Sequence, residues 1–250
     1  GDGRLVDVNG DGFDDLFSNT YSAASVTGSV ALLHLNQGTG NFQTSAPMTA
    51  LGIGGFGGTV LAADFDNDGD IDIFSPNDQS RGDGALNWYL VNNGSGIFAD
   101  AAAAAGVAAN PAGAPYVPRG GQAVDFDENG FVDLIFGSRL MLNNGDGTFT
   151  DGSAAARMPA IADNGLRLAD LDLDGDLDLV HSTGSVTRLF RNAGGVFGDG
   201  EVIGEVPGDQ FGFGLTACDI NGDGFEDLVI ADNSLPSGLG APKILINVRS

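Results

Sequence analysis

The sequence has little cysteine, few basic residues and no long apolar run, and each shortage excludes a class of protein. The single cysteine, Cys218, excludes an internal disulfide, and the apolar run around it predicts a small buried side chain. Lys and Arg number 10 against 34 acidic residues, giving a net charge of −24. Nucleic acid and anionic membranes are therefore poor partners. No apolar run reaches the roughly 18 residues of a membrane-spanning helix, so membrane insertion is not expected.

Signatures of catalysis are also missing. The sequence contains no triad motif, no phosphate-binding loop and no zinc-binding pattern. Its two histidines, His34 and His181, fall in predicted strands, where we expect packed or surface residues. We therefore do not expect an enzyme. A polysaccharide lyase with Tyr116, Arg119 and His181 in a channel is the alternative.

What the sequence has in abundance is acid, concentrated in five short loops. Each loop has side-chain oxygens at positions 1, 3, 5 and 9 and glycine at position 6, and 22 of the 34 acidic residues lie in these loops. Carboxylates this close repel one another strongly unless a cation lies among them. Alternate oxygen ligands around a glycine turn suit Ca²⁺, so the pattern predicts about five Ca²⁺ ions, one per loop.

Position 7 of the loops varies, as expected for a residue that contributes only its backbone carbonyl. The predicted metal ligands are Asp7, Asn9, Asp11, Phe13, Asp15, Asp64, Asp66, Asp68, Asp70, Asp72, Asp125, Asp127, Asn129, Phe131, Asp133, Asp170, Asp172, Asp174, Asp176, Asp178, Asp219, Asn221, Asp223, Phe225 and Asp227.

Three alternative interpretations fit these loops less well. An EF-hand needs Glu at position 12 and flanking helices, whereas no copy has Glu there and the flanks resemble strands. Glycine-rich nonapeptide rolls need contiguous repeats, whereas the first aspartates here lie 45 to 61 residues apart. Simple polar turns would leave clusters such as Asp64, Asp66 and Asp68 without a neutralising charge. The pattern therefore indicates a metal loop between two strands.

Four predicted strands accompany each loop. Short runs rich in strand formers flank the loop, and an Asn-Gly turn follows in the segments 35–42, 91–98, 142–149 and 191–197. Asn and Gly are expected to supply the positive φ of a hairpin there, and the segment that begins with the Phe at the end of each turn is expected to form the outer strand. Four strands per repeat at this spacing are typical of β-propeller blades. The predicted fold class is all-β: a five-bladed β-propeller of four-stranded antiparallel blades.

The repeats assign the whole chain, residues 1–250, to a single β-propeller domain. The predicted blades cover approximately residues 1–50, 51–105, 118–155, 160–205 and 209–250. The fifth repeat reaches only its third strand, at 243–247, so we expect the last blade to lack its outer strand. That leaves an exposed edge, or one completed by a partner or by further sequence.

Specific binding is expected outside the repeated loops, because irregular loops carry function more often than scaffold does. The candidates are the segments 76–85 and 99–121, the second of which is expected to contain a short helical turn, and the edge near 243–250.

The aromatic candidates for sugar stacking are Tyr21, Trp88, Tyr89 and Tyr116. Packing between blades is the simpler role for Trp88. A single tryptophan also argues against a lectin that repeats its aromatic site in every blade.

The loops, their strand flanks and the starts Phe56-Gly57 and Phe213-Gly214 resemble FG-GAP/VCBS repeats. These are the calcium-binding blades of integrin-α-like β-propellers, and the resemblance covers nearly the whole chain. It implies Ca²⁺ at the side-chain oxygens of the first loop and at the matching positions of the others. The chain has fewer repeats than the integrin propeller. A closed ring of five blades is therefore the prediction, and five blades of a larger ring the alternative.

The resemblance implies a calcium-stabilised module for protein interaction, adhesion or assembly, with a protein or glycan ligand at the cell surface. Calcium dependence suits a secreted or cell-surface location. The chain starts at Gly1 without an initiator Met or a signal peptide, so we expect a mature or excised part of a longer protein. A carbohydrate-binding module or a polysaccharide lyase domain is the alternative function.

Overall fold

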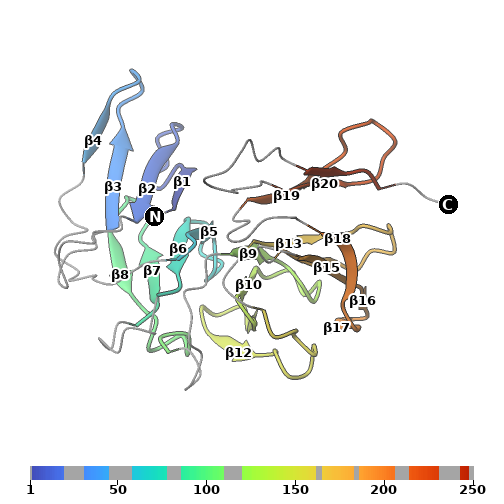
Figure 1. Ribbon diagram of the computed structural model, residues 1–250. Helices are drawn as coiled ribbons and strands as arrows, with labels where there is room; N and C mark the ends of the chain where they lie inside the picture. The colour runs from blue at the N-terminus through green and yellow to red at the C-terminus, as the bar shows by residue number, and fades with distance from the viewer. Residues whose placement is uncertain are drawn as a thin grey trace, which may run out of the picture. The chain divides into compact units, whose positions relative to one another are not determined.

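The structure is a computed structural model that describes residues 2–19, 31–44, 58–77, 86–109, 120–161, 165–182, 186–205, 214–230 and 243–247. Within these ranges every regular element is a β-strand, as Figure 1 shows. The same ranges contain no helix long and apolar enough to cross a membrane. The prediction of an all-β fold is confirmed.

The strands form successive sheets that follow the order of the chain. The first sheet contains β1 (Gly3–Val6), β2 (Asp15–Asn19), β3 (Ala31–Asn36) and β4 (Phe42–Thr44). The second contains β5 (Leu61–Ala63), β6 (Asp72–Ser75), β7 (Trp88–Asn92) and β8 (Phe98–Asp100). The third contains β9 (Gly121–Val124), β10 (Asp133–Phe136), β11 (Arg139–Asn143) and β12 (Phe149–Asp151).

The fourth and fifth sheets continue this series. The fourth contains β13 (Leu166–Ala169), β14 (Asp178–Ser182), β15 (Val186–Phe190) and β18 (Glu201–Glu205). The fifth contains β19 (Leu215–Cys218), β20 (Asp227–Ile230) and β21 (Lys243–Leu245). Neighbouring strands pair antiparallel in the first, second, fourth and fifth sheets. Four-stranded antiparallel sheets of this kind are the units of β-propellers.

The fourth sheet departs from the predicted strand assignment. Its outer strand is β18, whereas the segment that starts at Phe197 was expected in that place. Phe197 instead lies in a small hairpin formed by β16 (Asn192–Ala193) and β17 (Val196–Phe197). The turn after β15 has one residue fewer than its counterparts, so the chain closes a tight hairpin before it returns to the sheet. In the fifth sheet β21 is the outermost described strand.

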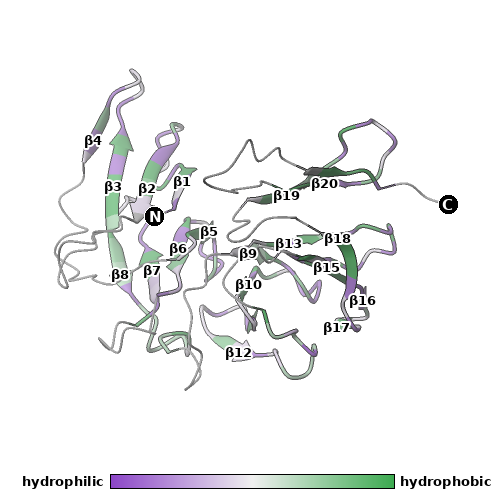
Figure 2. Ribbon diagram, in the orientation of Figure 1, coloured by the Kyte–Doolittle hydropathy of each residue, from purple (hydrophilic) through white to green (hydrophobic). Residues whose placement is uncertain are grey.

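The chain divides into two compact units, and the boundary runs through the third sheet. The first unit contains residues 1–118, 123–134 and 141–150, and the second contains 119–122, 135–140 and 151–250. Figure 2 shows hydrophobic residues gathered on the strands and hydrophilic residues at many of the turns. The assignment of residues 1–250 to one domain stays a prediction.

In the first unit, apolar residues from the first and second sheets share one core. Phe17 and Leu33 of the first sheet belong to the same buried cluster as Ile73 and Trp88 of the second. Trp88 is 4% exposed, so it packs between sheets, as the simpler interpretation predicted. A buried indole has no face available for a sugar.

A second contact in this unit is aromatic. Phe65, Tyr89 and Phe149 meet edge to face, with ring centroids 5.8 to 6.2 Å apart. Such pairs add about 0.5–1.5 kcal/mol each beyond the area that they bury. Tyr89 is fully buried, so it stabilises the packing of the second sheet on the third and is not a binding platform.

In the second unit, the fourth and fifth sheets share a core that includes Leu171, Val180, Ala217 and Leu228. Cys218 is exposed, so the prediction of a buried cysteine is wrong. Alternation along β19 explains the difference, because Ala217 faces the core and the next side chain points to the opposite face.

Two short turns link neighbouring sheets in the same way. The N–H of Ala105 donates to the carbonyl of Ala101 at 2.9 Å, and the Ala105 carbonyl accepts from Phe149 N–H at 3.0 Å. The N–H of Ala156 donates to Gly152 at 3.0 Å, and its carbonyl accepts from Phe197 N–H at 3.0 Å. The short helical turn predicted after residue 99 is therefore present. Its recurrence makes the described part of 99–121 a scaffold feature.

Candidate metal centres

All five acidic loops are organised by the aspartate at position 1. One of its oxygens accepts the backbone N–H of position 5, and the other accepts the N–H of the position 6 glycine at 2.8 to 3.1 Å. The glycine donors are Gly12, Gly69, Gly130, Gly175 and Gly224. This carboxylate therefore closes the loop around itself.

Two positions of each loop have left-handed backbone geometry. The position 6 glycines have φ between 87° and 99°, as the predicted glycine turn requires. Position 4 is also left-handed, which the sequence pattern did not reveal for three of the loops. It is glycine in the first and fifth loops, but Asn67, Glu128 and Leu173 in the others, with φ of 61°, 57° and 58°. In the sequence, Gly10 and Gly222 at position 4 of the first and fifth loops were the residues that indicated a left-handed conformation there.

The aspartate at position 9 lies at the base of each loop, and all five copies are 0% exposed. One oxygen accepts a backbone N–H from an asparagine at or just beyond the end of the third strand, at 2.7 to 2.9 Å. These asparagines are Asn36, Asn92, Asn143, Asn192 and Asn247. In the four predicted hairpins, asparagine and glycine together were expected to supply positive φ. The prediction is confirmed for glycine and wrong for asparagine, because only glycines have positive φ in these described turns.

Three of the asparagine side chains join neighbouring loops. Asn143 Nδ2 donates to Val132 O of its own loop at 2.9 Å and to Phe65 O of the second loop at 2.8 Å. Asn92 makes the equivalent bond to Val8 O at 2.8 Å, and Asn247 to Leu171 O at 2.7 Å. Each of these residues therefore fixes the buried aspartate of one loop and the backbone of the preceding loop.

Three loops bring carboxylate oxygens within 4.8 Å of one another: Asp64, Asp66 and Asp72 in the second, Asp125, Asp127 and Asp133 in the third, and Asp170, Asp172 and Asp174 in the fourth. The first and fifth loops have Asn9 and Asn221 at position 3. The amide oxygens of these residues accept the N–H of Asp11 and Asp223 at 3.0 and 2.8 Å.

The second loop shows most clearly why a cation fits. Asp66 Oδ1 is buried and has no hydrogen-bond partner, so it retains full capacity to bind a metal. Burial, reinforced by the charge of Asp66, raises the pKa of Asp72 to about 7. In the third loop burial likewise raises the pKa of Asp133 to about 6. A hard cation among these oxygens would supply the missing charge.

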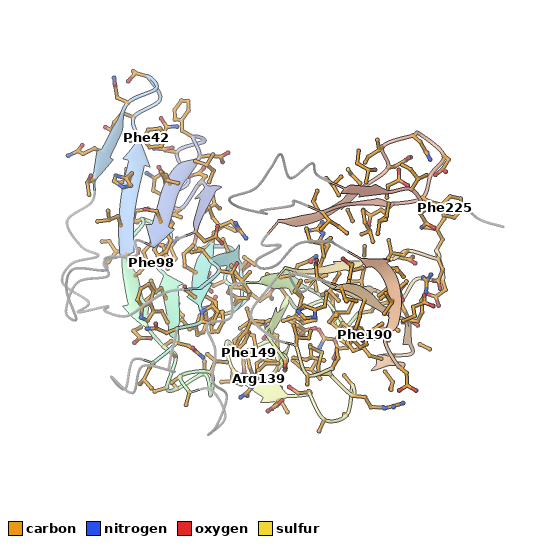
Figure 3. The ribbon with its side chains drawn as sticks, viewed as in Figure 1. Phe42, Phe98, Arg139, Phe149, Phe190 and Phe225 are labelled. Carbon is orange, nitrogen blue, oxygen red and sulfur yellow. The ribbon has the colours of Figure 1, made fainter. Side chains whose placement is uncertain are left out.

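Position 7 has a role beyond its carbonyl. A Cβ placed on Gly38 would lie 2.7 Å from the ring of Phe13, and one on Gly145 would lie 2.5 Å from the ring of Phe131. In the second loop Asp70 occupies this place against Gly94. In the first three loops the side chain at position 7 therefore closes on a glycine of the following hairpin. After each of the first three hairpins an outer strand begins with phenylalanine, at Phe42, Phe98 and Phe149 (Figure 3).

The other predicted candidates do not form a second site among the described residues. His34 Nδ1 lies 3.0 Å from Thr44 Oγ1, and His181 is 4% exposed within β14. Both histidines lie in strands, as predicted. Several candidates lie outside the described residues: Tyr21, Tyr116, Arg119, Phe56-Gly57, Phe213 and most of the segment 76–85.

The repeated loops and strands correspond to a known family. The sequence matches the FG-GAP-like repeat family over residues 7–75, 125–181 and 170–230, which is well over half of the chain. The chain belongs to the FG-GAP-like repeat family. This confirms the resemblance that the acidic loops and their strand flanks indicated.

Two animal proteins resemble this chain in sequence. Cartilage acidic protein 1 of Homo sapiens is 32% identical over 180 residues, which cover 64% of this chain and 26% of that protein. The Mus musculus protein of the same name is 30% identical over 179 residues, with the same coverage. The matched region thus spans about a quarter of the length of these relatives.

A solved structure shares the fold. A lectin from Agrocybe aegerita, described as recognising non-reducing terminal N-acetylglucosamine, aligns with a TM-score of 0.54 and 21% identity. The alignment covers 98% of this chain and 65% of the lectin. At this identity the likeness concerns the fold alone.

Proposed function

We propose that this FG-GAP chain is a calcium-stabilised β-propeller that serves as an interaction or adhesion module outside the cell. The observation that carries the calcium part is the second loop, where three carboxylates converge and Asp66 Oδ1 is buried without a hydrogen bond. When bound, Ca²⁺ would supply positive charge and link the loop's oxygen ligands. The ligands proposed are the residues at positions 1, 3, 5, 7 and 9 of all five loops.

The role of calcium in this proposal is structural. The position 9 aspartates are buried and accept bonds from the asparagines described above, three of which also bond the neighbouring loop, so a charge without a counterion at this position is unfavourable. Sites of the extracellular class bind Ca²⁺ at roughly 10⁻⁴–10⁻³ M. At millimolar calcium each site would add on the order of 1–2 kcal/mol to the free energy of unfolding.

Calcium titration by calorimetry tests the metal sites. We expect about five Ca²⁺ per chain, and we expect Asp66→Asn to remove or weaken one of them. Asp199→Asn is the matched control, because Asp199 is exposed and lies outside the acidic loops. Absence of calcium binding by the unaltered chain, or equal loss in both variants, would contradict the assignment.

The interaction role is supported by the family and by the names of the relatives, which refer to cartilage. A secreted or cell-surface protein in millimolar calcium is the setting in which such sites fill. Calcium-dependent binding of the chain to cell-surface proteins, measured with calcium and with EDTA, tests this role. Equal binding in both conditions would contradict a calcium-dependent module. A partner that completes the sheet beyond β21 stays a prediction.

Glycan binding is the second candidate. It is favoured by the shared fold with a lectin described as recognising terminal N-acetylglucosamine. Trp88 and Tyr89 are buried, so a sugar site would have to use other residues. A glycan array separates the two roles: retention on N-acetylglucosamine-terminated glycans supports the lectin role, and a blank array favours a protein ligand. The lyase alternative is tested by assay on acidic polysaccharides.

A further inference from the structure

The fourth loop has the same carboxylates as the second but a different neighbour. Both loops have aspartate at positions 1, 3, 5, 7 and 9. The residue before the asparagine that binds position 9 is Arg191 in the fourth repeat and Val91 in the second. The other three repeats have Leu35, Leu142 and Ile246 there. The fourth loop is thus the one copy with a basic residue at this place.

Arg191 reaches into the acidic loop. Its Nη1 donates to Asp178 Oδ2 at 2.6 Å and lies 3.2 Å from Asp172 Oδ2. In the second loop the matching oxygen, Asp72 Oδ2, instead accepts the backbone N–H of Phe65 at 3.2 Å and the uncharged hydroxyl of Tyr89 at 3.3 Å. Asp178 is fully buried, whereas the Arg191 side chain is 43% exposed.

The carboxylates of the fourth loop are also grouped differently. In the second and third loops the converging acids come from positions 1, 3 and 9, whereas in the fourth they come from positions 1, 3 and 5. The buried aspartate that joins the group elsewhere, Asp178 here, is bonded to the guanidinium.

The hairpin that carries Arg191 differs as well. Gly194 N–H donates to Asp176 Oδ2 at 2.7 Å, whereas Gly145 N–H in the third repeat donates to Asn143 Oδ1 at 2.9 Å. Asn192 Oδ1 is consequently buried without a hydrogen-bond partner. The short hairpin places its backbone and Arg191 on the acidic loop together.

We propose that Arg191 is a built-in counterion that competes with Ca²⁺ for Asp172 and Asp178, so that the fourth loop binds Ca²⁺ more weakly than the second. The inference rests on the proposed calcium function. A guanidinium stays charged at all physiological pH values, so an ion that enters the loop must displace Arg191 or bear its repulsion. The partly exposed side chain is able to move into solvent. The chain then has strong calcium sites and one weak site whose loop is partly neutralised without metal.

Site-resolved titration tests this proposal. The amides of Gly69 and Gly175 occupy the same position in the two loops and donate to Asp64 and Asp170 at 3.0 and 3.1 Å. Their ¹⁵N–¹H signals therefore report occupancy of each loop as calcium is added to the full chain. We define the half-shift as the point at which a signal has moved half of its total change. We expect the half-shift of Gly175 at a calcium concentration about tenfold higher than that of Gly69, which corresponds to a difference in binding free energy of about 1.4 kcal/mol.

Three variants separate charge from packing. Arg191→Gln removes the charge and retains a donor for Asp178, and should lower the calcium concentration of the Gly175 half-shift about tenfold. Arg191→Lys retains a cation and should leave the calcium concentration of the Gly175 half-shift high. Val91→Arg places a cation beside the second loop, and should raise the half-shift of Gly69.

Equal half-shifts in the unaltered chain, or an unchanged Gly175 titration in folded Arg191→Gln, would overturn the competition by Arg191. If Arg191→Gln does not fold, two other results test the competition by Arg191: the difference between the Gly69 and Gly175 half-shifts in the unaltered chain, and the titration of Val91→Arg. If neither glycine signal moves in millimolar calcium, the proposed calcium function itself fails, which is a different result.

Discussion

At the residue scale, a few residues of the acidic loops have an unfavourable backbone conformation or an unfavourable environment. Leu173 occupies a left-handed conformation with φ of 58° and is 51% exposed. Asp72 is fully buried among other carboxylates, and its pKa is raised to about 7. Neither state is favourable by itself, and the proposed Ca²⁺ would offset the second by placing positive charge beside Asp72.

Relieving the strain at position 4 should stabilise the protein. Leu173→Asn places a residue that tolerates the left-handed region where the second loop already has Asn67. We expect the free energy of unfolding to rise by about 1 kcal/mol, measured by urea unfolding in saturating calcium. Leu86→Asn is the control, because Leu86 is 52% exposed and is not among the residues with positive φ. Equal effects of the two substitutions would show that position 4 is not strained.

The buried aspartates give the calcium-free protein a defined pH dependence. Burial raises the pKa of Asp72 from 3.8 to about 7, so the folded state binds a proton more tightly than the unfolded state does. This stabilisation is complete below the ordinary pKa and is lost as the pH rises through about 7. In EDTA the chain should therefore unfold at higher urea concentration at pH 5 than at pH 8.

The substitution Asp72→Asn assigns that pH dependence to one residue. It mimics the protonated carboxyl, so the calcium-free variant should show a smaller gain in stability on acidification than the unaltered chain. Asp199→Asn, on an exposed carboxylate, should leave the gain unchanged. An identical gain in all three proteins would place the titrating groups elsewhere.

At the element scale, the asparagine at or just beyond the end of each third strand bonds the position 9 aspartate of its own loop, and in three repeats its side chain also bonds the neighbouring loop. Asn143→Ala removes two hydrogen bonds from the side-chain amide to backbone carbonyls, at 2.8 and 2.9 Å, and leaves Phe65 O and Val132 O without that donor. We expect a loss of about 2–3 kcal/mol in the free energy of unfolding. Asn144→Ala is the matched control, because its exposed side chain donates to Thr148 Oγ1 only locally. Similar losses for both would argue against a bridging role for Asn143.

The elements also show which features the sequence could predict. Local patterns were sufficient for the acidic loops, their flanking strands and the four-stranded sheets, because each depends on residues close together in the chain. The bond from Asn143 to Phe65 joins residues 78 positions apart, and nothing local distinguishes it from a turn preference. Cys218 was misassigned for a related reason, because an apolar run does not reveal which face of β19 is covered.

Arg191 shows the same limit of sequence-based prediction at the fourth acidic loop. Its place before Asn192 is visible in the sequence, but its bond to the buried Asp178 depends on a hairpin one residue shorter than the others. The left-handed position 4 was visible only where glycine occupies it, at Gly10 and Gly222.

At the scale of the whole molecule, calcium is proposed to act on every repeat, so its removal should affect the chain as a unit. The aligned region spans about a quarter of the FG-GAP relatives, and the ligand of this chain and its number of blades stay predictions. Stabilisation by five sites would be comparable to the roughly 5–15 kcal/mol stability of an ordinary domain. Loss of all five ions is therefore the largest perturbation that the proposal allows.

Thermal unfolding of the chain with and without calcium tests the central claim most directly. In millimolar Ca²⁺ at pH 7.4 the melting temperature should exceed that in EDTA by at least about 10 °C, because several sites each add on the order of 1–2 kcal/mol. Magnesium at the same concentration should restore little of the difference, since it demands a smaller and more rigid ligand set. Coincident melting curves in calcium and EDTA would contradict the account.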